Sequence, residues 1–226
     1  MAKSHASAWA SDAPTPAQIK EFFAQVESGK ITKRNFQKFL RGDTPKGECA
    51  ELLADWQRFY KKHFNLDKDF STLRIPEQKE GFDRLIVVVE GMTPEKLFSA
   101  IKSLTPAWKH SDNLDAIVSE RKADKDYAIW VRDRQEADEE LKNKSANDLN
   151  QEGIPGITLE ERLLYELKFF DETGKHLDVQ KITLCAGSRD PDGYVPGVSW
   201  YDGEVHVRWY YPDRWYDGLR ARVVVS

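Results

Sequence analysis

The sequence predicts an α+β protein in which a small N-terminal helical bundle precedes a mixed α/β domain ending in an antiparallel, aromatic-rich sheet. Apolar residues recur at helical spacing between residues 15 and 64. Helix and strand patterns then follow one another from residue 85 to residue 174, and turn residues separate strand patterns from residue 182 onward. We therefore divide the chain into a flexible tail at 1–14, a helical segment at 15–66, a linker at 67–82 and an α/β domain at 83–226.

Three amphipathic helices are expected in the helical segment. The first opens at Pro16, because proline fits the first helical position, and it stops at Gly29. The second follows Thr32, and the third spans residues 47–64. The second helix carries an outward basic row of Lys33, Arg34, Lys38 and Arg41.

The α/β domain opens with patterns of buried strands and capped helices. Residues 85–89 and 127–131 are short apolar runs rich in β-branched or aromatic residues, which is typical of buried strands. One helix is expected after Thr93-Pro94, and a very polar helix with a solvated face from Asp138 to Lys144. A further helix should run from the capping box of Thr158 and Glu161 to Gly174.

Asp202-Gly203 is the clearest local signal, because a two-residue Asp-Gly loop favours a type I′ hairpin. The hairpin register pairs Tyr201 with Glu204 and Ser199 with His206. One face then carries Pro196, Val198, Trp200, Val205, Val207 and Trp209. The other face carries Ser199, Tyr201, Glu204, His206 and Arg208, with Tyr210 beyond them.

The polar hairpin face is the candidate site. Residues 219–225 alternate as a last strand, and pairing of this strand with the hairpin would add its arginines to the same face. The candidate ligand-binding residues are Tyr201, His206, Arg208, Tyr210, Arg220 and Arg222. Arginine beside exposed aromatic rings suits a carboxylate, a phosphate or a stacked base. The competing interpretation is an ordinary solvated sheet face with cross-strand pairs to Glu204.

Charge and motifs favour a non-catalytic binding or interaction module over the common enzyme classes. The net charge is -4, with +3 on residues 1–70 and -7 on residues 71–226. The +3 balance is too mild to imply nucleic acid, and the -7 region would repel phosphate unless its basic groups are clustered. The expected partner is a protein or a small anionic ligand, and nucleic acid remains an alternative through the basic second helix and the same sheet face. The sequence has no P-loop, GxGxxG, GxSxG, HExxH or paired CxxC, and no cofactor is expected.

Two weaker patterns suggest a catalytic site and a metal site. Cys185 and His206, with an acid such as Asp190, could form a nucleophile and base in an enzyme of unfamiliar type. Cys185 ends an apolar strand, however, and such a cysteine is more often a small buried hydrophobe. Residues 188–193 begin like a calcium loop but have Ser188 at the first position, so a turn is favoured and no metal site is expected.

The chain is expected to be cytoplasmic. Its two cysteines, Cys49 and Cys185, show no metal spacing and fit a reducing compartment. No run of 18 apolar residues occurs, so no membrane partner is expected.

Several long segments carry a resemblance: GKITKRNFQKFL (29–40), GFDRLIVVVEGMTPEKLF (81–98), YAIWVRDRQEADEELKNKSANDL (127–149), GIPGITLEERLLYELKFFDETGKHLDV (153–179) and TLCAGSRDPDGYVPGVSW (183–200). Through them the chain resembles a family of uncharacterised proteins that recurs in small-genome, uncultured bacteria. The resemblance covers nearly the whole chain. It implies a bacterial intracellular protein and supplies no activity, cofactor or catalytic residue.

Overall fold

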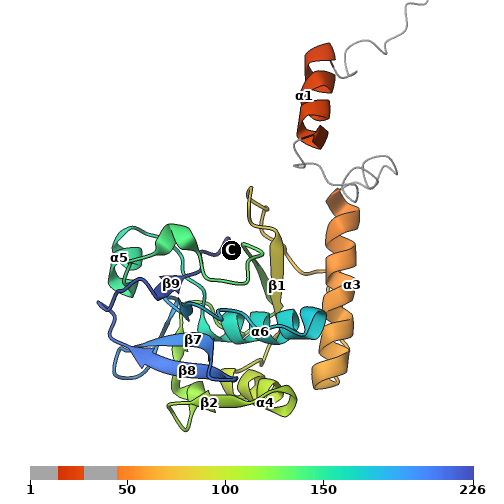
Figure 1. Ribbon diagram of the computed structural model, residues 1–226. Coiled ribbons are helices and arrows are strands. Elements are labelled where there is room, and N and C mark those ends of the chain that lie inside the picture. Colours follow the sequence, from red (N-terminus) through yellow and green to blue (C-terminus); the bar gives the residue numbers. More distant parts are fainter. Residues whose placement is uncertain (1–14, 28–44) are drawn as a thin grey trace, which may run out of the picture. The chain divides into compact units, whose positions relative to one another are not determined.

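The computed structural model describes residues 15–27 and 45–226 (Figure 1). The chain divides into two compact units between Ala54 and Asp55, and the candidate site lies in the second unit. The first predicted helix is confirmed as α1 (Pro16–Glu27), and the third as α3 (Pro45–Phe64), which continues into the second unit. The predicted tail and the predicted second helix lie outside the described residues.

The remaining helices and 3-10 turns of the second unit are α4 (Pro94–Leu104), η1 (Leu114–Ala116), η2 (Glu139–Leu141), α5 (Ala146–Gln151) and α6 (Leu159–Thr173). Its strands are β1 (Arg84–Val88), β2 (Ala107–Lys109), β3 (Val118–Ser119), β4 (Tyr127–Val131), β5 (Ile182–Leu184), β6 (Ser188–Arg189), β7 (Val195–Tyr201), β8 (Glu204–Tyr210) and β9 (Leu219–Ala221). These helices, together with one five-stranded sheet and two two-stranded sheets, make the protein α+β.

Five strands form the main sheet, in the order β2-β8-β7-β5-β9. Strand β7 runs antiparallel to both of its neighbours, β5 and β8. The prediction of a purely antiparallel sheet is wrong at both edges, because β2 runs parallel to β8 and β9 runs parallel to β5. Each edge strand has only three residues, and each reaches its partner from a distant part of the chain, so no local turn signal marks the pairing.

The β7–β8 hairpin has the predicted register, with Tyr201 opposite Glu204 and Ser199 opposite His206. Asp202 and Gly203 have φ angles of 52° and 81°. Positive φ at both central residues is what a type I′ turn requires, and such a turn matches the twist of the flanking strands. The local sequence therefore determines which side chains share a face of this hairpin.

Strands β1 and β4 form a separate antiparallel ribbon whose outer edge is covered by α3. The indole N–H of Trp56 donates to the carbonyl of Leu85 over 3.2 Å, and the hydroxyl of Tyr60 donates to the carbonyl of Val87 over 2.6 Å. These bonds satisfy carbonyl groups that would otherwise be free at a sheet edge. The sequence-predicted strands 85–89 and 127–131 are confirmed here.

Helix α6 packs against β7, β1 and α4 (Figure 1). Its predicted capping box is present, because the backbone N–H of Glu161 donates to Thr158 and the Glu161 carboxylate accepts the N–H of Thr158. Gly174 ends the helix in the left-handed conformation, with φ of 66°. Leu163, Leu164 and Leu167 are buried.

The predicted polar helix from Asp138 to Lys144 is wrong. The segment forms only the short turn η2, because Asn143 takes a left-handed φ of 61°. Asp138 is buried and not solvated, and its carboxylate accepts from Arg132 Nη1 and from the backbone N–H of Val223, each over 2.8 Å. Contacts with the C-terminal segment therefore override the local helical pattern.

The segment predicted as a linker, 67–82, contains no helix or strand. It nevertheless packs on the second unit, since Phe70 and Phe82 are buried. The second unit starts at Asp55, so the last part of α3 and this segment belong to it.

Four charged side chains form a buried network beneath α6. Arg162 donates from Nε and Nη2 to one oxygen of Asp178, over 3.0 and 2.8 Å, and from Nη1 to Glu166 over 2.9 Å. Arg222 donates from Nη2 to the other oxygen of Asp178 over 2.8 Å. All four residues are 0–1% exposed. Two guanidinium groups thus face two carboxylates, which leaves no net charge within this network.

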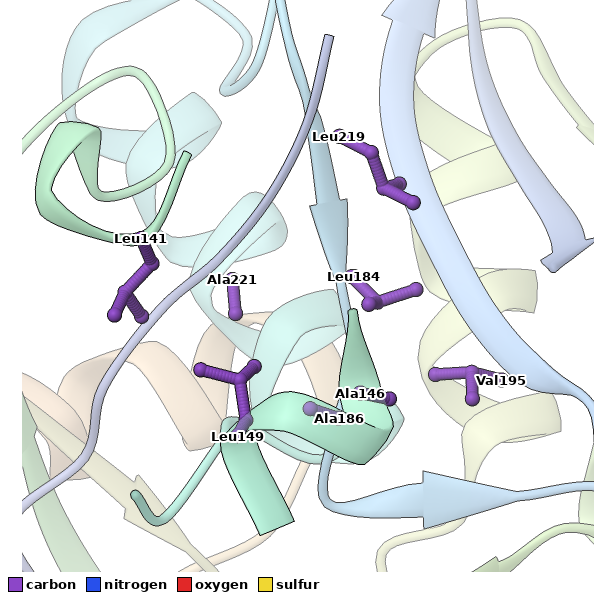
Figure 2. Packing of buried hydrophobic residues seen from close by; sticks show 8 residues of the cluster. All are labelled: Leu141, Ala146, Leu149, Leu184, Ala186, Val195, Leu219 and Ala221. Atoms are coloured by element: carbon purple, nitrogen blue, oxygen red, sulfur yellow. The ribbon is translucent and has the colours of Figure 1, made fainter. Parts of the chain in front are cut away.

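A cluster of apolar residues packs on the face of the main sheet opposite to α6, at the β5 and β9 end of the sheet (Figure 2). Its buried members are Leu141, Ala146, Leu149, Leu184, Ala186, Val195, Leu219 and Ala221. They come from η2, α5 and the strands, so the two short helical elements cover this half of the face.

We expect Asp178→Asn to destabilise the protein strongly. The substitution keeps the shape of the side chain, and asparagine accepts the left-handed φ of 53° found at this position. It leaves Arg162 and Arg222 buried without full compensation, which should lower the free energy of unfolding by about 3–5 kcal/mol in chemical denaturation. Asp217→Asn is the matched control, because Asp217 pairs with Lys181 at the exposed surface. Equal effects of the two variants would contradict the role of the network.

Candidate functional site

The other half of the same sheet face is open. Directly opposite residues on neighbouring strands point to the same face. The register therefore places one row of side chains across the sheet: Ala221, Leu184, Gly197 and Arg208. The apolar cluster covers the β9 and β5 end of this row, and Arg208 on β8 lies at the uncovered end.

Four further residues extend the uncovered end. Trp108 on β2 lies opposite His206, and the backbone N–H of His110 donates to Val207 over 3.0 Å, which continues the β2 pairing. Tyr201 lies at the hairpin end of the same face. We call the five residues Trp108, His110, Tyr201, His206 and Arg208 the open face.

Arg208 is held between aromatic rings. Its guanidinium carbon lies 5.1 Å from the ring centre of Tyr201 and 6.0 Å from that of Trp108. Its Nη2 lies 3.2 Å from Nδ1 of His206. Within the described residues, no carboxylate lies at ion-pair distance from Arg208. The guanidinium is thus positioned by ring contacts and by the imidazole of His206, and Arg208 is half-buried.

His206 is packed among the same groups. Its ring centre lies 5.3 Å from that of Trp108 and 5.7 Å from that of Tyr201. Burial, followed by the positive charge of Arg208, lowers the pKa of His206 below its usual value. The neutral imidazole can therefore accept a hydrogen bond from Arg208 at Nδ1, which puts the ring proton on Nε2, 3.5 Å from Glu204.

Tyr210 lies on the same face but belongs to the apolar cluster. A Cβ built on Gly197 would lie 2.4 Å from Cε2 of Tyr210, so the ring lies directly over this glycine. Tyr210 packs against the cluster, and the glycine under its ring lies directly opposite Arg208 in the β7–β8 register. Glycine is required at position 197 because any side chain there would displace the Tyr210 ring.

Arg220 and Arg222 are not part of the open face. Strand β9 pairs with β5 at the far edge of the sheet, and the register puts Arg220 opposite Thr183, on the other face. Arg220 pairs with Glu139. Arg222 is in the buried network and also donates to the backbone carbonyls of Arg134 and Gln135. The structure thus brings together Tyr201, His206 and Arg208. Tyr210 lies beside them but packs against the apolar cluster, and Arg220 and Arg222 lie elsewhere.

Trp108 and His110 are site residues that the sequence did not reveal. Trp108 lies in the three-residue strand β2, which has no alternating pattern, and His110 directly follows it. The strand pairs with β8 from a position that is separated from it in sequence by about half the length of the second unit. The feature that marks Trp108 as a site residue is its 41% exposure, and this exposure can be read from the structure but not from the sequence.

Two hollows lie at this end of the sheet. The arginine hollow, of about 340 Å³, is lined by Trp108, His110, His206, Arg208 and Trp209. The tyrosine hollow, of about 770 Å³, has a lining that includes Tyr194, Trp209, Tyr211, His110 and three aspartates. The two hollows share His110 and Trp209 and therefore meet where β2 ends.

Cys185 and His206 are not brought together as a nucleophile and base. Cys185 follows β5 and bonds through its N–H to Pro196, whose register places it on the face opposite to His206. Its side chain is fully buried, and burial raises the pKa of its thiol well above the usual range. A protonated, inaccessible thiol does not act as a nucleophile.

The calcium-like segment is a turn. Asp190 Oδ1 accepts the backbone N–H groups of Asp192 and Tyr194 over 3.0 and 2.7 Å. The Ser188 hydroxyl, at the first position of the pattern, is buried against Ser119 and the N–H of Leu159. In the part of the chain that the structure describes, no three His, Cys, Asp or Glu side chains gather as a metal site would require.

Among the described residues, no helix has the length and apolar character needed to cross a membrane. Comparison with protein-family models, with curated proteins and with solved structures gives no match to this chain. The resemblance to a bacterial family therefore stays a prediction, and function must be argued from the geometry of the site.

We expect Cys185 to resist alkylation in the folded protein. Iodoacetamide at neutral pH should label the half-buried Cys49 well before Cys185, because the Cys185 thiol is buried and protonated. Both cysteines should react at similar rates in denaturant. Peptide mapping by mass spectrometry measures the two rates, and rapid labelling of Cys185 in the folded state would revive the enzyme hypothesis.

Proposed function

We propose that the protein is a non-catalytic binding protein whose open face takes a small organic anion with a planar body. The observation that carries this proposal is Arg208, which is held by two aromatic rings in a hollow whose lining contains no carboxylate. The anionic group of the ligand, a carboxylate, phosphate or sulfonate, would receive charge-assisted hydrogen bonds from the guanidinium.

The contrast with other arginines supports this assignment. Arg132, Arg162 and Arg222 each donate to a carboxylate, which fixes them in the fold. Arg208 has no such partner among the described residues. An arginine that is ordered but not neutralised by its own chain is available to an external anion.

The aromatic surroundings determine the shape of the ligand. Trp108 and Tyr201 are 41% and 59% exposed, so their rings offer stacking surfaces on either side of the guanidinium. The arginine hollow, at about 340 Å³, is at the small end of the range of ligand sites. We therefore favour a single planar ring that carries one anionic group over an extended polymer.

Two alternatives use the same surface. A nucleic acid could stack its bases on Trp108 and Tyr201, with Arg208 contacting a phosphate. The predicted basic helix that would assist it lies outside the described residues, and the neighbouring tyrosine hollow carries three aspartates that repel phosphate. An acidic protein surface could also pair with Arg208. We further propose that the protein acts in the bacterial cytoplasm, as its cysteine usage and family resemblance suggest.

We expect Arg208→Gln to abolish most of the anion affinity. Benzenesulfonate and phenyl phosphate are the probes, and titration followed by nuclear magnetic resonance reports both affinity and location. Loss of a charged hydrogen-bond donor should weaken binding about tenfold to a hundredfold. Arg214→Gln is the matched control, because Arg214 also lies over a tyrosine ring, that of Tyr216, but lines neither hollow.

Equal affinity of the Arg208→Gln and wild-type proteins for benzenesulfonate would overturn the proposal. The absence of any chemical-shift change at Trp108 and His206 at a millimolar concentration of the probe would also overturn it. Tight, salt-sensitive binding of a single-stranded oligonucleotide, without binding of the small probes, would favour the nucleic-acid alternative.

We expect anion affinity to rise as the pH falls. His206 is neutral at pH 7 because its pKa is lowered, first by burial and then by Arg208. Acidification through that lowered pKa adds a positive charge beside Arg208, and Nδ1 no longer accepts its hydrogen bond. Benzenesulfonate keeps a constant charge between pH 5 and pH 8, so its affinity reports the protein alone.

The His206→Gln variant separates this effect from titration elsewhere. Its affinity for benzenesulfonate should change less with pH than that of the wild-type protein. An identical pH dependence in both proteins would show that His206 does not titrate beside the ligand.

A further inference from the structure

The tyrosine hollow is a second candidate binding site, which shares His110 with the open face. Alternation along the hairpin places Trp209 on the face opposite to Arg208, and the same alternation beyond the strand ends places Tyr194 and Tyr211 with it. The ring centres of Tyr194 and Tyr211 lie 5.0 Å apart. Three aromatic side chains therefore line one hollow of about 770 Å³.

A tight turn holds one wall of this hollow. The Asp190 carboxylate accepts two backbone N–H groups, and the backbone N–H of Asp190 donates to the carbonyl of Tyr194 over 2.9 Å. Gly193 has a φ of 88°, a conformation that favours glycine. The turn thus positions Asp190, Asp192 and Tyr194 without help from a ligand.

The charge of this hollow is the reverse of that of the arginine hollow. Its lining contains three carboxylates, Asp112, Asp190 and Asp192, and neither lysine nor arginine. Asp112 and Asp192 are exposed, and Asp190 is half-buried. Complementarity with this lining requires a cationic partner.

The walls show which kind of cation fits. Tyrosine and tryptophan rings attract alkylammonium groups through their negative faces, and the same rings offer apolar contact to the alkyl substituents. A bare metal ion needs several converging oxygen ligands, and among the described residues no group of three acidic, histidine or cysteine side chains converges in this way.

We propose that the tyrosine hollow binds an alkylammonium group, held by Tyr194, Trp209 and Tyr211 and neutralised by the surrounding aspartates. This site does not depend on Arg208, and its occupant need not be the ligand of the open face. The aromatic rings supply the specificity for an alkylated cation, and the carboxylates supply the charge complementarity.

Choline chloride is the probe, titrated into the full chain and followed by nuclear magnetic resonance. Binding should shift the signals of Tyr194, Trp209 and Tyr211. The neutral carbon isostere of choline, in which a tert-butyl group replaces the trimethylammonium group, should bind at least threefold more weakly. Equal binding of the two molecules would overturn the proposal, because it would show an apolar hollow without cation selectivity.

Substitutions at Tyr211 test the role of the ring directly. Tyr211 is 62% exposed, so its replacement leaves the core intact. Tyr211→Phe retains the ring and should bind choline as the wild-type protein does. Tyr211→Leu retains apolar bulk without the ring and should lose affinity about threefold to thirtyfold. Unchanged affinity in Tyr211→Leu would contradict the proposal.

Charge variants complete the test. Asp192→Asn should weaken choline binding, and Asp202→Asn, in the exposed hairpin turn, should leave it unchanged. Arg208→Gln should bind choline normally, so this variant separates a failure of the open face from a failure of the tyrosine hollow. Displacement of choline by equimolar calcium chloride would show a metal site in its place and overturn the assignment.

Discussion

The buried pairing of Arg162 and Arg222 with Asp178 is the interaction on which the rest of the second unit depends. It joins α6 and the segment just after that helix to Arg222, which directly follows β9 and is distant from both in sequence. Charges at this depth are stable only when each is paired and hydrogen-bonded. Arg222 meets this condition by donating to Thr183 and to two backbone carbonyls as well as to Asp178. These bonds fix β9 beside β5 and leave the other edge of the sheet for β2.

That placement creates the candidate site. The face that carries Arg208 is apolar and covered by η2 and α5 at the β9 end, and it is open at the β2 end. Arg208 and Arg222 are the same residue type with opposite environments. Arg222 is neutralised by its own chain and serves the fold, and Arg208 is held by rings in a half-buried position that lines a hollow. Position in the sheet, and not residue type, distinguishes a structural arginine from a binding arginine here.

Local signals in the sequence predict local structure well. The Asp202-Gly203 turn, the capping box of Thr158 and Glu161, and the apolar runs of β1 and β4 each appear as expected, because their determinants lie within a few residues. Long-range pairing could not be predicted. The assignment of Arg220 and Arg222 to the site assumed that β9 pairs with the hairpin, and Trp108 reaches the site through three residues without a pattern. The candidate site was therefore half predicted, at Tyr201, His206 and Arg208.

The central claim is that Arg208 is free to bind an anion while Arg162 and Arg222 are committed to the fold. Nuclear magnetic resonance of the guanidinium Nε–H groups, in protein labelled at arginine, tests both parts in one experiment. We predict that added benzenesulfonate shifts the signal of Arg208, whereas the signals of Arg162 and Arg222 stay unchanged and exchange slowly with solvent. A fast-exchanging Arg222 that responds to the anion, together with a silent Arg208, would contradict the account.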